Sequence, residues 1–554
     1  MIFLGKSFGE FFTSSGFRKI DAFILVILFA LSFSAYFSFS QPNLITSPDE
    51  LVLLLSANSL RERNSLNFSN PLNSESGQCV FIPNHFVFKS VDEIYPLVFI
   101  GSAFFYAFIT SINENFFFWI IPFAGALMVL LVYLISLKLL NSRVFSILAA
   151  IVFFSSPIVV RVSTSSYNMA LASAFFLAAV FFMLLLQKRA FIIFSGILFS
   201  ISFFLRQDFL LFLPAMLLFI YLSAKKDWRR NFAHFLAPVV AFALLTLLLN
   251  LAYFNDAFFT PYGFSDSNPC IAQGSNGPKQ PIEIVARYLF RFNELGPLEL
   301  FGMIARHFVY FFQSSFAFPL AVFSVIGLLL FFKENKKFFF LVLIVFFIIL
   351  AFYGNRESVG VFEETLNSSF LRYMLPFYAF LSVCFASLAK KAAGMFRQPI
   401  AKCFLAFLLL ALVLTVQLDI SYNHPRYGID DVQNSLKKHL SAQRQAILES
   451  TEPDSAIFLS NNTDKLVYPE RKNTINISTI DTLDANNTSK EIVEWLHEKG
   501  IKVYFVYYLY DSQEHKDLFS YLKGEFDLEL KKSAEYKNFL VFEILEKQAF
   551  KKRA

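Results

Sequence analysis

The sequence predicts a polytopic α-helical membrane protein of about 11 to 13 transmembrane helices with a small C-terminal extracytoplasmic α/β domain. Hydrophobic residues make up 56% of the 554 residues, and the mean hydropathy of +0.53 exceeds what a soluble core requires. Charged residues, 16% of the chain, occur in short clusters between apolar runs of about 17 to 25 residues, the length at which a helix crosses a bilayer. After Ser421 the composition becomes charged and mixed, as in a soluble domain.

Eleven apolar segments are expected to span the bilayer, and the first is expected to be a retained signal anchor because it lacks a small-residue cleavage site. The segments are residues 21–40, 116–137, 144–160, 169–186, 190–205, 209–224, 232–253, 308–331, 338–353, 373–389 and 399–419. Basic clusters occupy alternate connections, at 138–143, 187–189, 225–230, 332–337 and 390–398. Because Lys and Arg beside spanning helices tend to stay in the cytoplasm, these connections and the N-terminus are predicted to be cytoplasmic.

The apolar segment 95–112 is a special case, because a full crossing there would reverse the orientation of every later helix. All five basic connections would then lie outside, so this segment is predicted to lie in the outer interface or to be re-entrant. The first outer loop, 41–115, and the soluble segment 421–554 are then both extracytoplasmic. The predicted division is a catalytic membrane domain, 1–420, and a soluble domain, 421–554.

The soluble segment has the alternating pattern of a small α/β domain. Strand-like runs at 456–460, 503–508 and 539–545 alternate with helix-like segments near 429–448, 489–499 and 513–524. The domain has no glycine-rich phosphate loop. A supporting or acceptor-binding role is therefore expected for it.

The four cysteines show no spacing typical of a structural zinc site. Cys79 and Cys270 both fall in predicted outer loops, where a disulfide can form in an oxidising compartment. A disulfide between them stays open from the sequence, and two free thiols are the favoured interpretation.

An acidic pair follows the first predicted span. Asp49 and Glu50 lie in the sequence Ser47-Pro48-Asp49-Glu50, at the start of a short amphipathic helix. Charged groups beside membrane helices are costly and therefore suggest function. The simpler alternative is an acidic cap, since carboxylates stabilise the positive end of a helix.

Basic residues are expected on the same membrane face. Arg206 lies at the outer end of one predicted span, Arg372 at the outer entrance of a later one, and Lys89 in the first outer loop. Snorkelling to the interface is the simpler explanation of each arginine. The remaining candidates, for substrate binding, are His85, Asp92, Glu93, Tyr95 and Tyr373.

An acid beside guanidinium groups at a lipid surface suits sugar transfer from a lipid phosphate. The carboxylate can act as general base on an acceptor hydroxyl. Arginine can bind the phosphate leaving group bidentately and stabilise its growing charge. The lipid-linked donor would enter sideways from the bilayer.

These motifs together resemble the GT-C superfamily, and within it the protein O-mannosyltransferases and the lipid A aminoarabinose transferases. Ser47-Pro48-Asp49-Glu50 matches the acidic motif that opens the first outer loop, and Arg206 fits a basic position after a later span. Arg372-Tyr373-Met374-Leu375-Pro376-Phe377-Tyr378 is similar to a late RYxLPxYP motif.

The resemblance, spread over most of residues 20–390, implies an inverting transfer from a polyprenyl or dolichyl phosphate sugar. It implies that Asp49 is the base and that Glu50 supports the acceptor or sugar. Arginines, with Lys89, would hold the donor phosphate. The acceptor is a protein, a lipid or a glycan, and no nucleic-acid partner is expected.

Two departures from the family pattern concern the first outer loops. Only Ile94-Tyr95-Pro96-Leu97 corresponds to a PPLYP-like element, and Asn168 stands where a second acid often occurs. No cofactor and no obligatory metal are therefore expected.

Two other classes of protein fit the composition. A transporter or lipid flippase would show inverted repeats or polar mid-membrane helices, whereas the predicted spans are apolar at their centres. A noncatalytic scaffold is the third possibility. The oligosaccharyltransferase subunit is less favoured, because its WWDYG-type sequence is absent. A prokaryotic plasma membrane is the preferred location.

Overall fold

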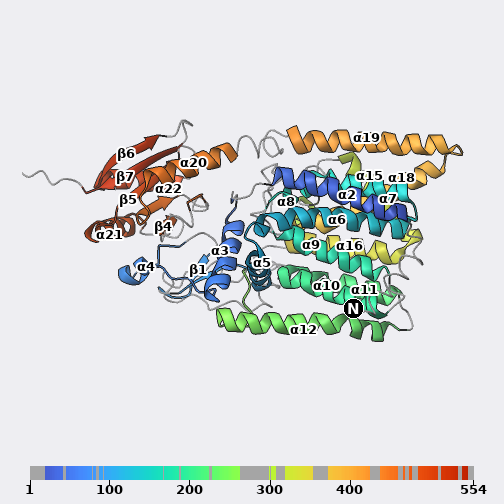
Figure 1. Cartoon of the computed structure of the whole chain (residues 1–554), viewed down its shortest axis with the longest axis horizontal. Helices are drawn as coiled ribbons and strands as arrows, with labels where there is room; N and C mark the ends of the chain where they lie inside the picture. Colours follow the sequence, from blue (N-terminus) through green and yellow to red (C-terminus); the bar gives the residue numbers. More distant parts are fainter. Residues whose placement is uncertain are drawn as a thin grey trace, which may run out of the picture.

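The computed structural model describes most of the chain between residues 19 and 546. The described residues are 19–40, 45, 47–77, 79–82, 86–91, 93–165, 168–185, 189–223, 227–261, 298–299, 301–302, 304–306, 308, 318–353, 372–423, 437–459, 466–467, 473–476, 485–508, 513–533 and 539–546. Apolar helices form an elongated bundle, and a mixed sheet with its helices lies beyond one end of it (Figure 1). We call this the sheet-side end and the other the far end.

The bundle is formed by helices that follow the apolar runs of the sequence. They are α2 (Lys19–Phe39), α6 (Phe116–Leu140), α7 (Arg143–Phe154), α8 (Pro157–Ser163), α9 (Met169–Met183), α10 (Arg189–Leu205), the 3₁₀ helix η1 (Gln207–Phe212), α11 (Leu213–Ser223), α12 (Trp228–Phe254), α15 (Phe318–Glu334), α16 (Lys336–Tyr353), α18 (Leu375–Gly394) and α19 (Pro399–Asn423). Each of the eleven expected spans overlaps one of these helices or a consecutive pair of them.

Within the described residues, four helices are long and apolar enough to cross a bilayer: α2, α6, α12 and Ile400–Ser421 of α19. The helices α7 and α8 make a fifth if the pair is one span, although they are bent by 64°. Pro157 accounts for this break, since it has no N–H to continue the ladder of α7 and suits the start of a new helix. The chain is thus an integral membrane protein with several spanning helices.

Residues 41–115, the first outer loop by the expected topology, contain α3 (Pro48–Arg63), α4 (Pro71–Ser76), β1 (Phe86–Phe88), β2 (Ile94–Pro96) and α5 (Ile100–Ile112). Helix α5 is the special segment of the sequence. Its 13 residues span about 20 Å, less than the roughly 30 Å of a hydrocarbon core. Its length therefore agrees with an interfacial or re-entrant position.

Close packing fixes α5 against α10. A Cβ on Gly101 would lie only 2.0 Å from the backbone oxygen of Phe204, so a glycine is required at this position. Beside it, the Ser102 hydroxyl, which is fully buried, donates to the Leu205 carbonyl at 2.5 Å. These contacts hold the start of α5 at the residue where α10 ends.

At the far end, an ion pair between a buried aspartate and a partly exposed arginine helps to join three helices. Asp21 on α2 is fully buried and accepts from Arg143 Nε at 2.7 Å and from Arg143 Nη2 at 2.8 Å. The Tyr133 hydroxyl of α6 donates to the same carboxylate at 2.8 Å. The first helix is thereby attached to the α6–α7 hairpin.

The C-terminal domain is a five-stranded mixed sheet of order β4-β3-β5-β7-β6. Its elements are α20 (Lys437–Ser450), β3 (Ala456–Leu459), β4 (Asn473–Asn476), α21 (Ala485–Glu498), β5 (Val503–Tyr508), α22 (Gln513–Glu525), β6 (Asp527–Ser533) and β7 (Phe539–Leu545). Strands β4, β3 and β5 are parallel, and β7 and β6 are antiparallel to their neighbours. The three expected strands are β3, β5 and β7, and the sheet adds β4 and β6 at its edges.

The first outer loop covers the β4 edge of this sheet. Phe81 forms an antiparallel bridge with Ile475 of β4, and its side chain is buried in the core of the C-terminal domain. Asn70 Nδ2 donates to Asn473 Oδ1 at 3.2 Å, and Lys499 pairs with Glu75 at 3.0 Å. The loop is therefore attached to both the bundle and the sheet.

One cysteine, Cys79, differs from the expectation of free thiols at positions 79 and 270. Cys79 is disulfide-bonded, so that interpretation is wrong for this residue. Cys384 is buried and Cys403 exposed, both as free thiols. Cys270 lies outside the described residues.

Candidate active site

The two acids of the opening motif point in different directions because of the start of α3. Ser47 caps the helix: its hydroxyl accepts from the Glu50 N–H at 3.3 Å, while the Ser47 N–H donates to Glu50 Oε2 at 3.3 Å. This reciprocal capping box directs Glu50 inward, where it is only 2% exposed. Asp49, one residue earlier, keeps a side chain that is 48% exposed.

Asp49 contacts an arginine that is distant in sequence. Its Oδ2 lies 3.4 Å from Nη1 of Arg372, whose side chain is 14% exposed. Arg372 directly precedes the region where α18 begins, at Leu375. The structure thus joins the first outer loop to the late motif, as the expected membrane face requires.

Arg206 contacts an acid and two aromatic rings. Its Nη2 donates to Asp208 Oδ2 at 2.9 Å, and its Nε lies 3.2 Å from Asp208 Oδ1. The guanidinium carbon also lies 5.0 Å from the centre of the Phe99 ring and 5.1 Å from that of Tyr373. Both aromatic distances are within the range of cation–π contacts.

A polar side chain, that of Asn168, also contacts Arg206. Arg206 Nη1 donates to Asn168 Oδ1 at 3.1 Å, and Asn168 Nδ2 donates to the Ser102 hydroxyl at 2.7 Å. Because Tyr373 is adjacent to Arg372, the groups around Arg206 and the Asp49–Arg372 pair form one continuous cluster.

Other candidate residues form a separate group in the β1–β2 hairpin. Lys89 Nζ donates to the Tyr95 hydroxyl at 3.2 Å and pairs with Glu93 at 3.3 Å. The hydrogen bond to Tyr95 is the main cause that raises the pKa of Lys89. Tyr95 is buried and its ring packs edge-on against Phe254 of α12. His85 and Asp92 lie outside the described residues.

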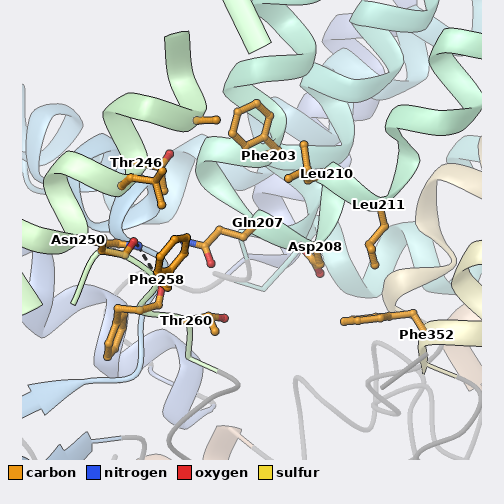
Figure 2. A pocket seen from close by; sticks show the side chains of 14 residues that line it. Phe203, Gln207, Asp208, Leu210, Leu211, Thr246, Asn250, Phe258, Thr260 and Phe352 are labelled. Atoms are coloured by element: carbon orange, nitrogen blue, oxygen red, sulfur yellow. Dashed lines mark hydrogen bonds between the residues drawn. The ribbon is translucent and has the colours of Figure 1, made fainter. Parts of the chain in front are cut away.

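A cavity of about 420 Å³ lies beside Arg206, and Asp208 is part of its wall. Figure 2 shows residues of η1, among them Gln207 and Asp208, and residues of α12, among them Thr246 and Asn250, with Phe352 on the other side. Most lining residues are apolar, such as Phe203, Leu210, Leu211, Leu247 and Phe258. Such a lining suits a hydrocarbon chain rather than a free sugar.

No protein-family model matches the sequence, and no curated protein matches it. Solved structures do match. ArnT from Cupriavidus metallidurans bound to undecaprenyl phosphate aligns with a TM-score of 0.51 at 11% identity, over 96% of this chain and 98% of that one. The apo state of the same protein gives a TM-score of 0.52 at 12% identity, over 94% of this chain and 98% of that one.

The chain has the ArnT fold. This likeness confirms, at the level of the fold, the resemblance drawn from the sequence motifs. It covers the helical bundle and the C-terminal sheet together, since nearly the whole of each chain is aligned. At such low identity the ArnT fold by itself assigns no role to any residue.

Within this ArnT fold, some functional candidates were missed by the sequence reasoning. Asp208 was overlooked, although an acid two residues after an arginine in an otherwise apolar run is a usable signal. The cavity residues of α12, Thr246 and Asn250, had no signal beyond being polar in an apolar helix. Thr246 and Asn250 line the same cavity as residues of η1 only because of tertiary packing, which the sequence does not display.

The described residues contain no group of three or more His, Cys, Asp or Glu side chains that could hold a metal ion. The expectation that no metal is obligatory stays a prediction.

Proposed function

We propose that the chain is a membrane glycosyltransferase that moves a sugar from a polyprenyl phosphate donor to a hydroxyl acceptor, with inversion. The observation that carries the proposal is the contact between Asp49 and Arg372, an accessible acid beside a guanidinium at one end of the bundle. The ArnT fold supports it, because a structure with that fold binds undecaprenyl phosphate.

The proposed reaction is a single displacement at the anomeric carbon. The acceptor oxygen forms a bond to this carbon while its proton passes to the Asp49 carboxylate. The bond from the anomeric carbon to the phosphate oxygen breaks, and its electron pair leaves with the lipid phosphate. Attack opposite the leaving group inverts the configuration.

Arg372 and Arg206 supply the positive charge for the leaving phosphate in this proposal, with Lys89 as a further phosphate contact. A guanidinium can stabilise the growing charge through directional N–H donors. Arg372 also contacts Asp49, so the base and this proposed phosphate contact belong to one cluster. Glu50 serves by fixing the start of α3, which keeps Asp49 oriented toward the site.

The cavity between η1 and α12 is assigned to the hydrocarbon of the carrier. Its lining is largely apolar, and it shares Asp208 with the Arg206 cluster. A prenyl chain there would place its phosphate near the cluster. His85, Asp92, Glu93, Tyr95 and Tyr373 are proposed contacts to the sugar or acceptor.

The proposal includes the orientation in the membrane. The sheet-side end is extracytoplasmic, the far end and its basic connections are cytoplasmic, and about 11 to 13 helices cross the bilayer. The membrane domain comprises residues 1–420 and the soluble domain 421–554, in a plasma membrane. The acceptor is a protein, a lipid or a glycan, and a dolichyl carrier is the less favoured donor.

One feature favours the alternative, a transporter or lipid flippase. Helices α7 and α8 are bent by 64° at their junction, and broken helices are typical of transport paths. A transporter has no need of a general base, so loss of the Asp49 carboxylate distinguishes the two functions.

The test is sugar transfer from radiolabelled polyprenyl-phosphate monosaccharides in membranes that contain wild type, Asp49→Asn or Arg372→Ala at matched protein levels. Glu62→Gln is a suitable control, because Glu62 is an exposed acid on the same helix as Asp49. We expect transfer by wild type and the control and a loss in both site variants. Full transfer by Asp49→Asn would refute the mechanism.

A further inference from the structure

Asn168 connects two parts of the cluster through both atoms of its amide. Its oxygen accepts from Arg206 Nη1 at 3.1 Å, and its nitrogen donates to the Ser102 hydroxyl at 2.7 Å. Ser102 in turn donates to the carbonyl of Leu205, the residue before Arg206. The amide is thus fixed by the same helix junction that positions the arginine.

Only a side chain with one acceptor and one donor satisfies these contacts as they stand. An aspartate at position 168 has the same shape and can accept from Arg206, but it has no donor for Ser102. The hydroxyl of Ser102 is already committed to Leu205. The amide is therefore the group that fits this geometry.

The charge of the cluster gives a second reason for the amide. Arg206 and Arg372 contribute two positive charges, and their acidic partners Asp208 and Asp49 contribute two negative ones. The formal charges of these four side chains sum to zero. A carboxylate at position 168 would be a second acid in contact with Arg206, beside Asp208, and would make the immediate surroundings of this arginine net negative where the proposed donor brings an anionic phosphate.

We propose that Asn168 is a positioning residue that sets the charge of this site. It holds Arg206 between Phe99 and Tyr373 without adding a negative charge, and so allows an anionic lipid phosphate to bind. The inference rests on the proposed function and deepens it.

The test measures binding of undecaprenyl phosphate to the full chain in nanodiscs of zwitterionic lipid. Asn168→Asp is compared with wild type, with the double variant Asn168→Asp/Asp208→Asn, and with Asn115→Asp. The double variant restores the original charge while exchanging the positions of acid and amide around Arg206. Asn115 is exposed and precedes α6, so its variant adds a negative charge outside the cluster.

We expect Asn168→Asp to weaken binding at least tenfold and the double variant to recover to within about threefold of wild type, since one added charge close to the phosphate is the cause. Asn115→Asp should bind like wild type. In transfer assays the Asn168→Asp variant should raise the KM for the donor and leave kcat within about twofold. If Asn168→Asp weakened binding only by disturbing the fold, adding Asp208→Asn would not restore the affinity.

Wild-type affinity in a folded Asn168→Asp variant overturns the inference, as does a double variant that folds but stays as weak as the single one. If Asn168→Asp does not fold, Ser102→Ala replaces it: removal of the amide's anchor should weaken binding at least threefold, and unchanged binding overturns the inference. Wild type that neither binds undecaprenyl phosphate nor transfers sugar refutes the proposed function itself, and the inference with it. The wild-type measurement therefore distinguishes failure of the proposed function from failure of the proposed role of Asn168.

Discussion

The two ends of the bundle each contain an aspartate paired with an arginine, and the pairs differ in what they leave open. At the far end, both oxygens of Asp21 accept short hydrogen bonds from Arg143, and the side chain is fully buried. At the sheet-side end, Asp49 is half-exposed and its contact with Arg372 is longer, at 3.4 Å. The first arrangement is complete without a ligand and joins helices, whereas the second leaves a carboxylate accessible for chemistry.

The largest expected effect is on activity at the sheet-side end. Asp49→Asn should lower kcat by roughly a thousandfold, the typical contribution of a general base. The temperature of unfolding should not change, because the side chain is half-exposed. Transfer assays and thermal unfolding of the same preparation check this. A variant that loses stability instead of activity would make Asp49 a structural acid like Asp21.

The opposite pattern is expected at the far end. Asp21→Asn should lower the free energy of unfolding by about 1 to 3 kcal/mol, because the fully buried carboxylate loses its charge-assisted hydrogen bonds with Arg143. Transfer per folded molecule should stay at the wild-type level. Arg143 is partly exposed, so the double variant Asp21→Asn/Arg143→Gln should recover part of the loss. A strong loss of transfer in folded Asp21→Asn would show that the pair at the far end is not purely structural.

A smaller change tests how firmly the sheet-side cluster is supported. Gly101→Ala places a methyl group against the Phe204 carbonyl and should destabilise the protein by about 1 to 3 kcal/mol. Since Ser102 and Arg206 lie beside this contact, the KM for the donor should rise as well. Gly394, whose added Cβ would meet nothing within 4 Å, gives a matched Gly→Ala control.

The smallest effect concerns the attachment of the first loop to the sheet. Lys499→Glu should cost no more than about 1 kcal/mol, because both members of the pair with Glu75 are half-exposed. The exchange Lys499→Glu/Glu75→Lys should restore stability. Thermal unfolding at low and high salt distinguishes this pair from the pair at the far end, whose aspartate is buried, since screening weakens exposed charges more.

The helices were predictable because long apolar runs and basic connections leave few alternatives. The sheet was harder. Strand β4 is short and polar, Asn-Thr-Ile-Asn, and β6 has charged residues at alternate positions, so neither has the apolar character of the three strands that were expected. Both are edge strands of the sheet: β6 is largely exposed, whereas β4 is covered by the first outer loop, a contact that its own sequence does not indicate.

The site was predictable only in part. Placing Asp49 and Arg372 on one face followed from the expected topology, and the contact between them agrees with it. The roles of these residues stay predictions. The enclosure of Arg206 by Asp208 and Asn168 was not predictable, because it depends on how η1 turns after α10 and on the approach of α5. In the sequence, Asn168 is notable only because it stands where a second acid often occurs in the family that the chain resembles.

The bridge between Phe81 and Ile475 has a consequence for how the protein is made. The two residues are 394 positions apart (475 minus 81), and at roughly 5 to 20 residues per second a ribosome needs about 20 to 80 seconds to travel between them. The loop that contains Asp49 is synthesised early, and it can pair with β4 only after that strand has also been synthesised. Assembly of the sheet-side end is therefore among the last events of biosynthesis, and an incomplete chain carries the acid without the β4 edge that holds its loop.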